Sequence, residues 1–152
     1  MSIGKIRNLN SGSGGGDTVN LLDTLTWVSL SPTKEQFWKN SDGSMYFGQP
    51  SGYEESSGGS ITSSYFMLKK TDTLQMVSKY YRGSNWGHGR VYLYDSSNTL
   101  IDSWTDDNIS GEINRFVTFS KTGLQGNYRW VFSFGQSGGS QVSFTVSKLQ
   151  IN

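Results

Sequence analysis

His88 is the residue best suited to acid–base chemistry, because it is the only histidine in the chain. Any mechanism that uses an imidazole as a general base or as a member of a catalytic triad must therefore use residues 84–90. Those residues lack the strand-turn-helix context of a nucleophile elbow, and one imidazole does not make a histidine metal site. We expect His88 to be an exposed or hydrogen-bonded loop residue and the protein not to be an enzyme.

The same loop has the residue types of a binding surface. Trp86 lies between Asn85 and Gly87, with His88 and Arg90 close by in the sequence. Saccharides stack the C–H face of a pyranose on an aromatic ring, while their hydroxyls pair with planar polar side chains. Trp86 is therefore a candidate ligand contact, and its packing as a buried loop anchor is an equally good interpretation.

Two tyrosines extend this candidate surface along the next predicted strand. Tyr92 and Tyr94 alternate with Val91 and Leu93, so one pair faces the core and the other faces outward. The aliphatic pair is the better core face, which places the two tyrosines and Arg90 on an outer surface. A cross-strand aromatic ladder without a ligand explains these rings slightly better than a ligand site does.

Paired carboxylates occur at Glu54-Glu55 and at Asp106-Asp107. A glycoside hydrolase needs two carboxyl groups about 5 to 10 Å apart across a cleft, and neighbours in sequence do not face each other in that way. One carboxylate from each pair facing the other is the alternative. We interpret both pairs as solvated loop charges.

Oxygen ligands for a cation occur near the first predicted strand, at Asp17, Asn20 and Asp23. The DxDxDG pattern of a calcium loop is absent, but these three side chains are candidate ligands of a structural calcium ion. We expect no other cofactor. Because the chain has no cysteine, disulfides, thiolate zinc sites and thiol nucleophiles are excluded.

Composition argues against two classes of partner. The chain has 13 Lys and Arg against 12 Asp and Glu, and the formal charge of +1 provides no field that would attract nucleic acid. No apolar stretch approaches the roughly 20 residues of a membrane helix, and no signal peptide is visible. We expect a soluble protein with neither nucleic acid nor a membrane as partner.

The first 16 residues differ in composition from the rest and end in SGSGGG. Glycine and serine have little to bury, so we expect residues 1–16 to be an extended arm and residues 17–152 a single domain. An arm of this kind becomes ordered when it contacts a neighbour. We therefore expect a homo-oligomer or a part of a larger complex, with assembly partners bound through the arm.

Short segments of alternating polarity predict an all-β fold. Strands are expected at 21–30, 36–40, 44–49, 60–68, 74–81, 90–94, 99–104, 115–120, 127–134 and 141–151. Helix is expected at most as one turn near residues 32–36. The expected core rings and aliphatic side chains are Tyr128, Trp130, Phe132, Phe134, Val142, Phe144 and Val146. About nine strands separated by turn signals predict an antiparallel two-sheet β-sandwich of the jelly-roll type.

Residues 58–105 resemble a known family. A Ser/Thr/Gly-rich strand start (GGSITSSYFML) is followed by a strand that ends in paired aromatics (LQMVSKYY) and by a hairpin (GRVYLYDSSNTLIDSWT). This order is similar to that of the galactose-binding-like jelly rolls found among carbohydrate-binding modules, and in phage baseplate, tail and other virion surface proteins. The resemblance implies a non-catalytic β-sandwich that recognises sugars through loops or a concave face, in some members with a structural calcium ion.

Two functions are consistent with these features. One is a carbohydrate-binding module that holds a cell-surface glycan and is displayed on a larger assembly such as a phage virion. The other is a purely structural virion protein, such as a capsid decoration, neck or tail component, anchored by residues 1–16. Both predict a location on a virion surface or outside a cell.

Overall fold

The computed structural model describes residues 17–30, 35–49, 59–83, 87–106, 111–136 and 141–152. Sheet A contains β1 (Val19–Asn20), β3 (Gln36–Lys39), β4 (Met45–Gln49), β7 (Thr73–Arg82), β10 (Ile113–Thr122) and β12 (Val142–Ile151). Sheet B contains β2 (Trp27–Ser29), β5 (Gly59–Ser63), β6 (Phe66–Leu68), β8 (Gly87–Asp95), β9 (Leu100–Thr105) and β11 (Gly126–Gln136). Within these residues the only helix is α1 (Leu21–Thr24). The described part of the chain contains no helix that is long and apolar enough to cross a membrane.

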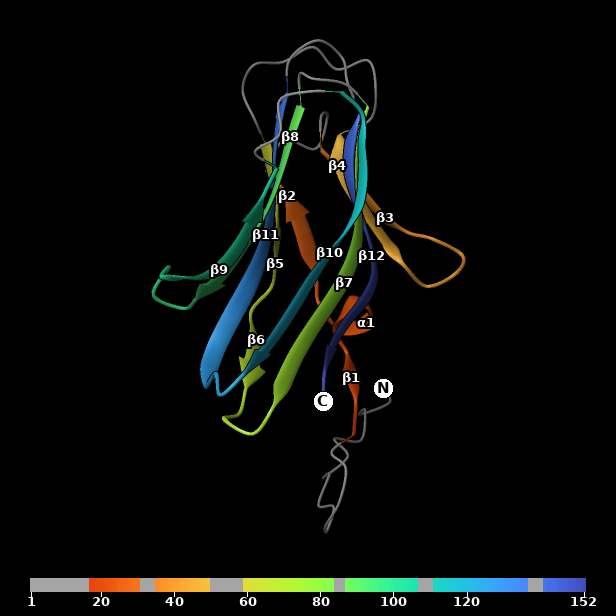
Figure 1. Ribbon diagram of the computed structural model, residues 1–152. Coiled ribbons are helices and arrows are strands. Elements are labelled where there is room, and N and C mark those ends of the chain that lie inside the picture. The colour runs from red at the N-terminus through yellow and green to blue at the C-terminus, as the bar shows by residue number, and fades with distance from the viewer. Residues whose placement is uncertain (1–16, 31–34, 50–58, 84–86, 107–110, 137–140) are drawn as a thin grey trace, which may run out of the picture.

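The two sheets lie against each other as a sandwich (Figure 1). Sheet A has the strand order β10-β7-β12-β4-β3 with β1 paired to β12, and sheet B has the order β2-β5-β11-β8-β9 with β6 paired to β11. Every pairing is antiparallel. This arrangement confirms the predicted two-sheet β-sandwich, with twelve strands in the described residues rather than about nine.

Aromatic rings from both sheets fill the core. Phe132 of β11 stacks on Phe47 of β4 with ring centroids 4.4 Å apart, and lies 5.3 Å from the ring of Phe144 on β12. The predicted core residues are all buried: Tyr128, Trp130, Phe132, Phe134, Val142, Phe144 and Val146. Large rings therefore supply much of the burial that the low aliphatic content cannot.

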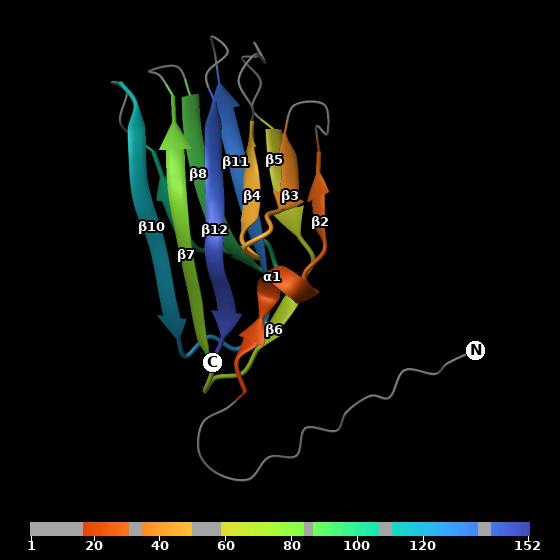
Figure 2. The same ribbon diagram turned by 90° about the vertical axis from the view of Figure 1, so that its right-hand side faces the viewer.

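The flank of the sandwich formed by β9 and β10 is closed by contacts between the sheets. Lys121 Nζ lies 2.8 Å from Asp102 Oδ2, and the Arg115 guanidinium lies over the Trp104 ring, 4.9 Å from its centroid. The strands β2 and β3 form the opposite flank, as the side view shows (Figure 2). Charged side chains at an edge strand protect it from pairing with another chain.

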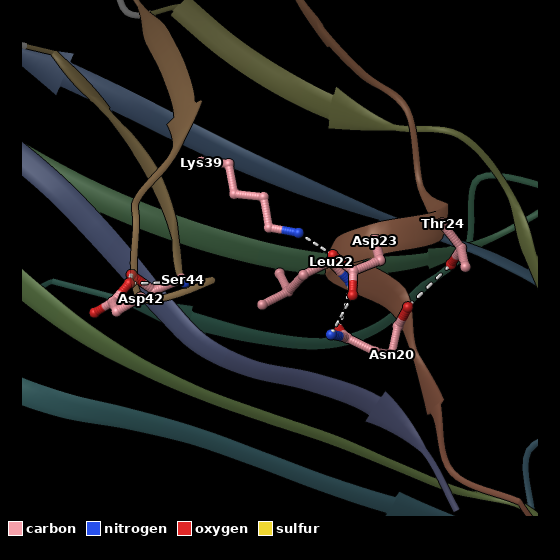
Figure 3. A network of polar contacts seen from close by, with 7 residues as sticks. All are labelled: Asn20, Leu22, Asp23, Thr24, Lys39, Asp42 and Ser44. Atoms are coloured by element: carbon pink, nitrogen blue, oxygen red, sulfur yellow. Dashed lines mark hydrogen bonds and ion pairs between the residues drawn. The ribbon is translucent and has the colours of Figure 1, made fainter.

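The helix α1 corrects one sequence prediction. Residues 21–24 are helical and do not begin a strand over residues 21–30. Asn20 explains this, because its side-chain oxygen accepts a 3.0 Å hydrogen bond from the backbone N–H of Leu22 and caps the helix (Figure 3). Of the helical turn expected near residues 32–36, residues 32–34 lie outside the described part, and Gln36 begins β3.

The strand predicted over residues 60–68 is also corrected, since it consists of β5 and β6. Both strands pair with β11, but Ile61 lies opposite Phe132 whereas Phe66 lies opposite Tyr128, so the register shifts by one residue between them. That shift lets Ile61 and Phe66, an odd number of residues apart, both point into the core. A strict alternation would have turned one of them outward.

Candidate functional site

The outward side of sheet B gathers the tyrosines and arginines that the sequence places near one another. Inward residues of its strands are buried, and residues that pair across strands share a face. We call this surface the tyrosine face. Its residues are Ser60, Thr62, Arg90, Tyr92, Tyr94, Arg129, Val131 and Ser133.

Tyr92 and Tyr94 point outward, as the alternation predicts. Val91 and Leu93 are fully buried, whereas both tyrosines are half-buried, with ring centroids 5.8 Å apart and planes inclined by 41°. Their strand β8 is paired on one side with β11 and on the other with β9, which fixes the position of its backbone. The two rings are therefore held beside each other on a rigid support.

A cross-strand aromatic ladder is not what holds these rings. The residues directly opposite Tyr92 are Val131 on β11 and Ser103 on β9. Opposite Tyr94, the β11 residue is Arg129. The ladder of directly opposed rings that the sequence slightly favoured is thus not formed on β11, because strand register sets aliphatic and cationic neighbours beside the rings. Binding of a ligand at these rings stays a prediction.

Arg129 is a residue of this face that the sequence analysis did not find. Its guanidinium carbon lies 5.8 Å from the ring centroids of both Tyr94 and Tyr65, within the range of a cation–π contact. Its Nη2 donates a 2.8 Å hydrogen bond to Oδ1 of Asn98. Asn98 sits in the β8–β9 turn with a left-handed φ of 61°. The turn therefore anchors the arginine beside the tyrosines.

His88 and Arg90 also occupy outward positions on β8, His88 half-buried and Arg90 exposed. His88 thus belongs to a strand and not to a loop. Gly89 between them faces the core, where an added Cβ would lie 2.2 Å from the ring of Tyr80, so only glycine fits there. Trp86 and Asn85 lie outside the described residues, and their contact with a ligand stays a prediction.

Asp106 corrects the interpretation of its carboxylate as a solvated loop charge. It is buried and its Oδ2 lies 3.2 Å from Nη1 of the fully buried Arg82. The hydroxyl of Tyr80 donates a 2.7 Å hydrogen bond to the same carboxylate oxygen. Burial, and then this hydrogen bond, raise the pKa of Tyr80 well above its ordinary value. Glu54, Glu55 and Asp107 lie outside the described residues.

The Arg82 side chain also ties together two chain segments. Nη1 donates to the carbonyl oxygen of Gly87 at 3.2 Å, and Nη2 donates to that of Gly111 at 3.1 Å. The amide of Gly89 donates a 3.0 Å hydrogen bond to the Tyr80 hydroxyl. The buried polar group therefore fixes the start of β8, the strand that carries the tyrosine face.

Two of the three candidate calcium ligands, Asn20 and Asp23, have a local structural role. Asn20 caps α1 and its Nδ2 donates a 2.8 Å hydrogen bond to Asp23 Oδ2, while Asp23 also pairs with Lys39 (Figure 3). Asp17 is exposed. Among the described residues, no three His, Cys, Asp or Glu side chains come together as a metal site would require. Calcium binding by Asp17, Asn20 and Asp23 stays a prediction.

Sheet A carries a second outward aromatic pair. Trp38 of β3 stacks on Tyr46 of β4 with centroids 3.9 Å apart and planes 11° apart. Its indole N–H donates a 3.0 Å hydrogen bond to Oδ1 of Asn40. This pair lies on an edge strand, and the neighbouring cation on the same face, Lys79, is two strands away from Tyr46. Rings and cations therefore lie closer together on the tyrosine face than around the Trp38–Tyr46 pair.

Comparisons with known proteins find solved structures of low sequence identity. No protein-family model and no curated protein matches the sequence. Among solved structures, a family 4 carbohydrate-binding module is similar at 11% identity, over 83% of this chain and 93% of that one, with a TM-score of 0.48. The K3 adhesin domain of Lys-gingipain from Porphyromonas gingivalis is similar at 8% identity, over 89% and 97%, with a TM-score of 0.49.

A third solved structure is a family 61 carbohydrate-binding module in complex with β-1,4-galactotriose. It is 9% identical, over 90% of this chain and 86% of that one, with a TM-score of 0.42. Two of these three proteins are carbohydrate-binding modules. At such identities and scores, the ligand has to be inferred from the residues of this chain.

Proposed function

We propose that this chain is a non-catalytic saccharide-binding module and that the tyrosine face is its binding surface. The observation that carries the proposal is the pair of outward rings, Tyr92 and Tyr94, held 5.8 Å apart on a strand that is paired on both sides. Arg90 and Arg129 lie at the two ends of this pair.

The chemistry of this face suits a sugar. The tyrosine rings offer apolar surface for the C–H face of a pyranose, and Ser133 and Thr62 offer hydroxyls that donate and accept hydrogen bonds. Because the supporting strands are already ordered, little conformational entropy is lost when a ligand binds. The sheet thus presents a preformed surface.

The described residues also support a role without catalysis. The single imidazole, His88, sits on a strand opposite Gly135 and has no carboxylate partner among the described residues. Asp106 is engaged in a buried ion pair with Arg82 and cannot serve as a solvent-facing general acid. No pair of facing carboxyl groups lies on the tyrosine face.

Binding to a panel of neutral and acidic polysaccharides, measured by affinity electrophoresis and isothermal titration calorimetry, tests the proposal. Loss of one ring from the face should cost about 1 to 2 kcal/mol, roughly 5- to 30-fold in affinity, in Tyr92→Ala and in Tyr94→Ala. Tyr81→Ala is the matched control, since Tyr81 lies outward on sheet A, between the buried Tyr80 and Arg82. Equal losses in all three variants would contradict the proposal.

We further propose that the module works outside a cell or on the surface of a virion, held on its assembly by residues 1–16. Apolar side chains on the β2–β3 flank support contact with a neighbouring subunit: Val28 is 59% exposed, Leu30 71% and Trp38 43%. Deleting residues 1–16 should then abolish incorporation into particles while saccharide binding persists.

The same flank supports a second candidate, a purely structural component of a virion. In that case the arm deletion again prevents incorporation, but no polysaccharide in the panel binds. The two candidates thus differ in the binding assay and not in the assembly assay.

A further inference from the structure

We propose that the tyrosine face selects acidic saccharides, meaning chains that carry carboxylate or sulfate groups. This inference rests on the proposed function and narrows its ligand class.

Two permanent cations on this face have no acidic partner within the part of the chain that the structure describes. Arg90 and Arg129 take part in none of the ion pairs among the described residues, which join Lys39 to Asp23, Arg82 to Asp106 and Lys121 to Asp102. In the described parts of β5, β8 and β11, no Asp or Glu occupies an outward position.

The nearest carboxylates in sequence are committed elsewhere. Asp95 Oδ1 accepts backbone hydrogen bonds from Ser97 and Thr99, both at 2.8 Å, within the β8–β9 turn. Asp102 pairs with Lys121 on the flank between the sheets. The positive charge of the tyrosine face is therefore left for a ligand to balance.

The spacing of the two arginines fits a chain lying along β8. Arg129 pairs with Tyr94, and Arg90 lies four residues before Tyr94, about 13 Å away at 3.3 Å per residue. Tyr92 lies between them and faces the same way. A saccharide stacked on the two rings would meet a guanidinium at each end.

Arginine is the side chain that best recognises carboxylate and sulfate, because its planar N–H groups pair with two oxygens at once. Asn98 takes one of the five N–H donors of Arg129. Its Nε is buried, but the hydrogen bond from Nη2 to Asn98 is the only one that joins its terminal N–H groups to the described residues, so the other terminal N–H groups remain for a ligand.

Nucleic acid is a poorer fit to the same face. Tight binding to a polyanion with a charge on every unit commonly involves six to ten phosphate contacts, whereas this face provides two arginines on a chain of formal charge +1. A polymer with widely spaced charges and stackable sugar rings matches two cations that flank two tyrosines.

The test compares matched polymers. Polygalacturonate is set against the same polymer after its carboxyl groups are reduced, dextran sulfate against dextran, and an oligothymidylate serves as the nucleic-acid probe. At least one acidic polymer should bind about tenfold more tightly than its neutral partner, and raising NaCl from about 50 to about 500 mM should remove most of the difference. The two acidic arms tell carboxylate from sulfate recognition.

Substitutions of single cations show which residues cause the preference for the acidic polymer. Arg90→Gln and Arg129→Gln should each reduce binding of the acidic polymer by about 3- to 10-fold and reduce binding of the neutral polymer less, so that the preference for the acidic polymer falls. The double variant Lys79→Gln, Lys148→Gln removes two cations from the outward side of sheet A and should leave both affinities unchanged.

Three results would overturn the inference. Equal binding of acidic and neutral polymers would refute it and leave the proposed function intact. Tighter binding of the oligothymidylate than of either acidic polysaccharide would assign the face to nucleic acid. Absence of binding to every polymer would refute the proposed function itself.

Discussion

Replacing Asp106 by asparagine removes one charge of the buried ion pair while keeping the size of the side chain. Arg82 is 0% exposed and Asp106 is 1% exposed, so water cannot solvate the guanidinium that remains. Removal of one member of a buried pair costs about 3 to 5 kcal/mol, a large part of the roughly 5 to 15 kcal/mol by which a domain is stable.

Urea unfolding followed by tryptophan fluorescence measures this loss. Asp102→Asn is the matched control, because the side chains of Lys121 and Asp102 are 36% and 29% exposed and such a pair contributes less than about 1 kcal/mol. The double variant Arg82→Met, Asp106→Leu should regain part of the lost stability, since it buries no unpaired charge. It should not regain all of it, because the carbonyls of Gly87 and Gly111 and the hydroxyl of Tyr80 each lose a hydrogen-bond partner. Asp106→Asn unfolding at the same urea concentration as Asp102→Asn would refute the reasoning.

Three further predictions concern stability. The pKa of Tyr80 is raised, so above pH 10 the hydroxyl ionises in the unfolded chain and stays neutral in the folded one. The free energy of unfolding should therefore fall by about 1.4 kcal/mol per pH unit above about pH 10. Tyr80→Phe should remove this contribution from the pH profile of the free energy of unfolding. Gly89→Ala should cost about 3 kcal/mol or more in urea unfolding because its Cβ meets the Tyr80 ring. Gly135→Ala should cost less than about 1 kcal/mol, because the nearest atom to its new Cβ, the His88 Cβ, is 3.9 Å away. Asn20→Ala should cost about 1 kcal/mol by loss of the helix cap and Asn20→Ser much less; equal costs in calorimetry would exclude capping as the cause.

The sheets could be predicted from the sequence because period-two alternation is a local property. On β11, Trp130, Phe132 and Phe134 recur at every second residue, and all three are buried. The same rule failed at residues 60–68, where a register shift between Ile61 and Phe66 has no signal within the segment itself. It depends on a partner strand more than 60 residues away.

The candidate site could be predicted in part for the same reason. Alternation along β8 indicated that Tyr92 and Tyr94 face outward, and the structure confirms it. Arg129 lies between the buried Tyr128 and Trp130, so its outward direction could have been predicted from the alternation. The position of Arg129 beside Tyr94 could not be predicted from the sequence, because it follows from the pairing of β8 with β11.

The buried charge of Asp106 could not have been predicted from its neighbours in sequence. A carboxylate that follows a strand is ordinarily solvated, and the sequence contains no mark of its partner. Arg82 and Tyr80 reach it from a strand of the opposite sheet. Only the packing of the two sheets brings the three side chains together.

The most direct test of the tyrosine face as a saccharide site is to map a bound sugar on the protein by NMR. Titration with the best ligand of the polysaccharide panel should shift the backbone amide resonances of Tyr92, Tyr94 and Arg129 and their neighbours on β8 and β11. Amides on the outward side of sheet A, such as those of Lys79 and Tyr81, should stay unchanged. Shifts confined to sheet A, with β8 and β11 unaffected, would contradict the account.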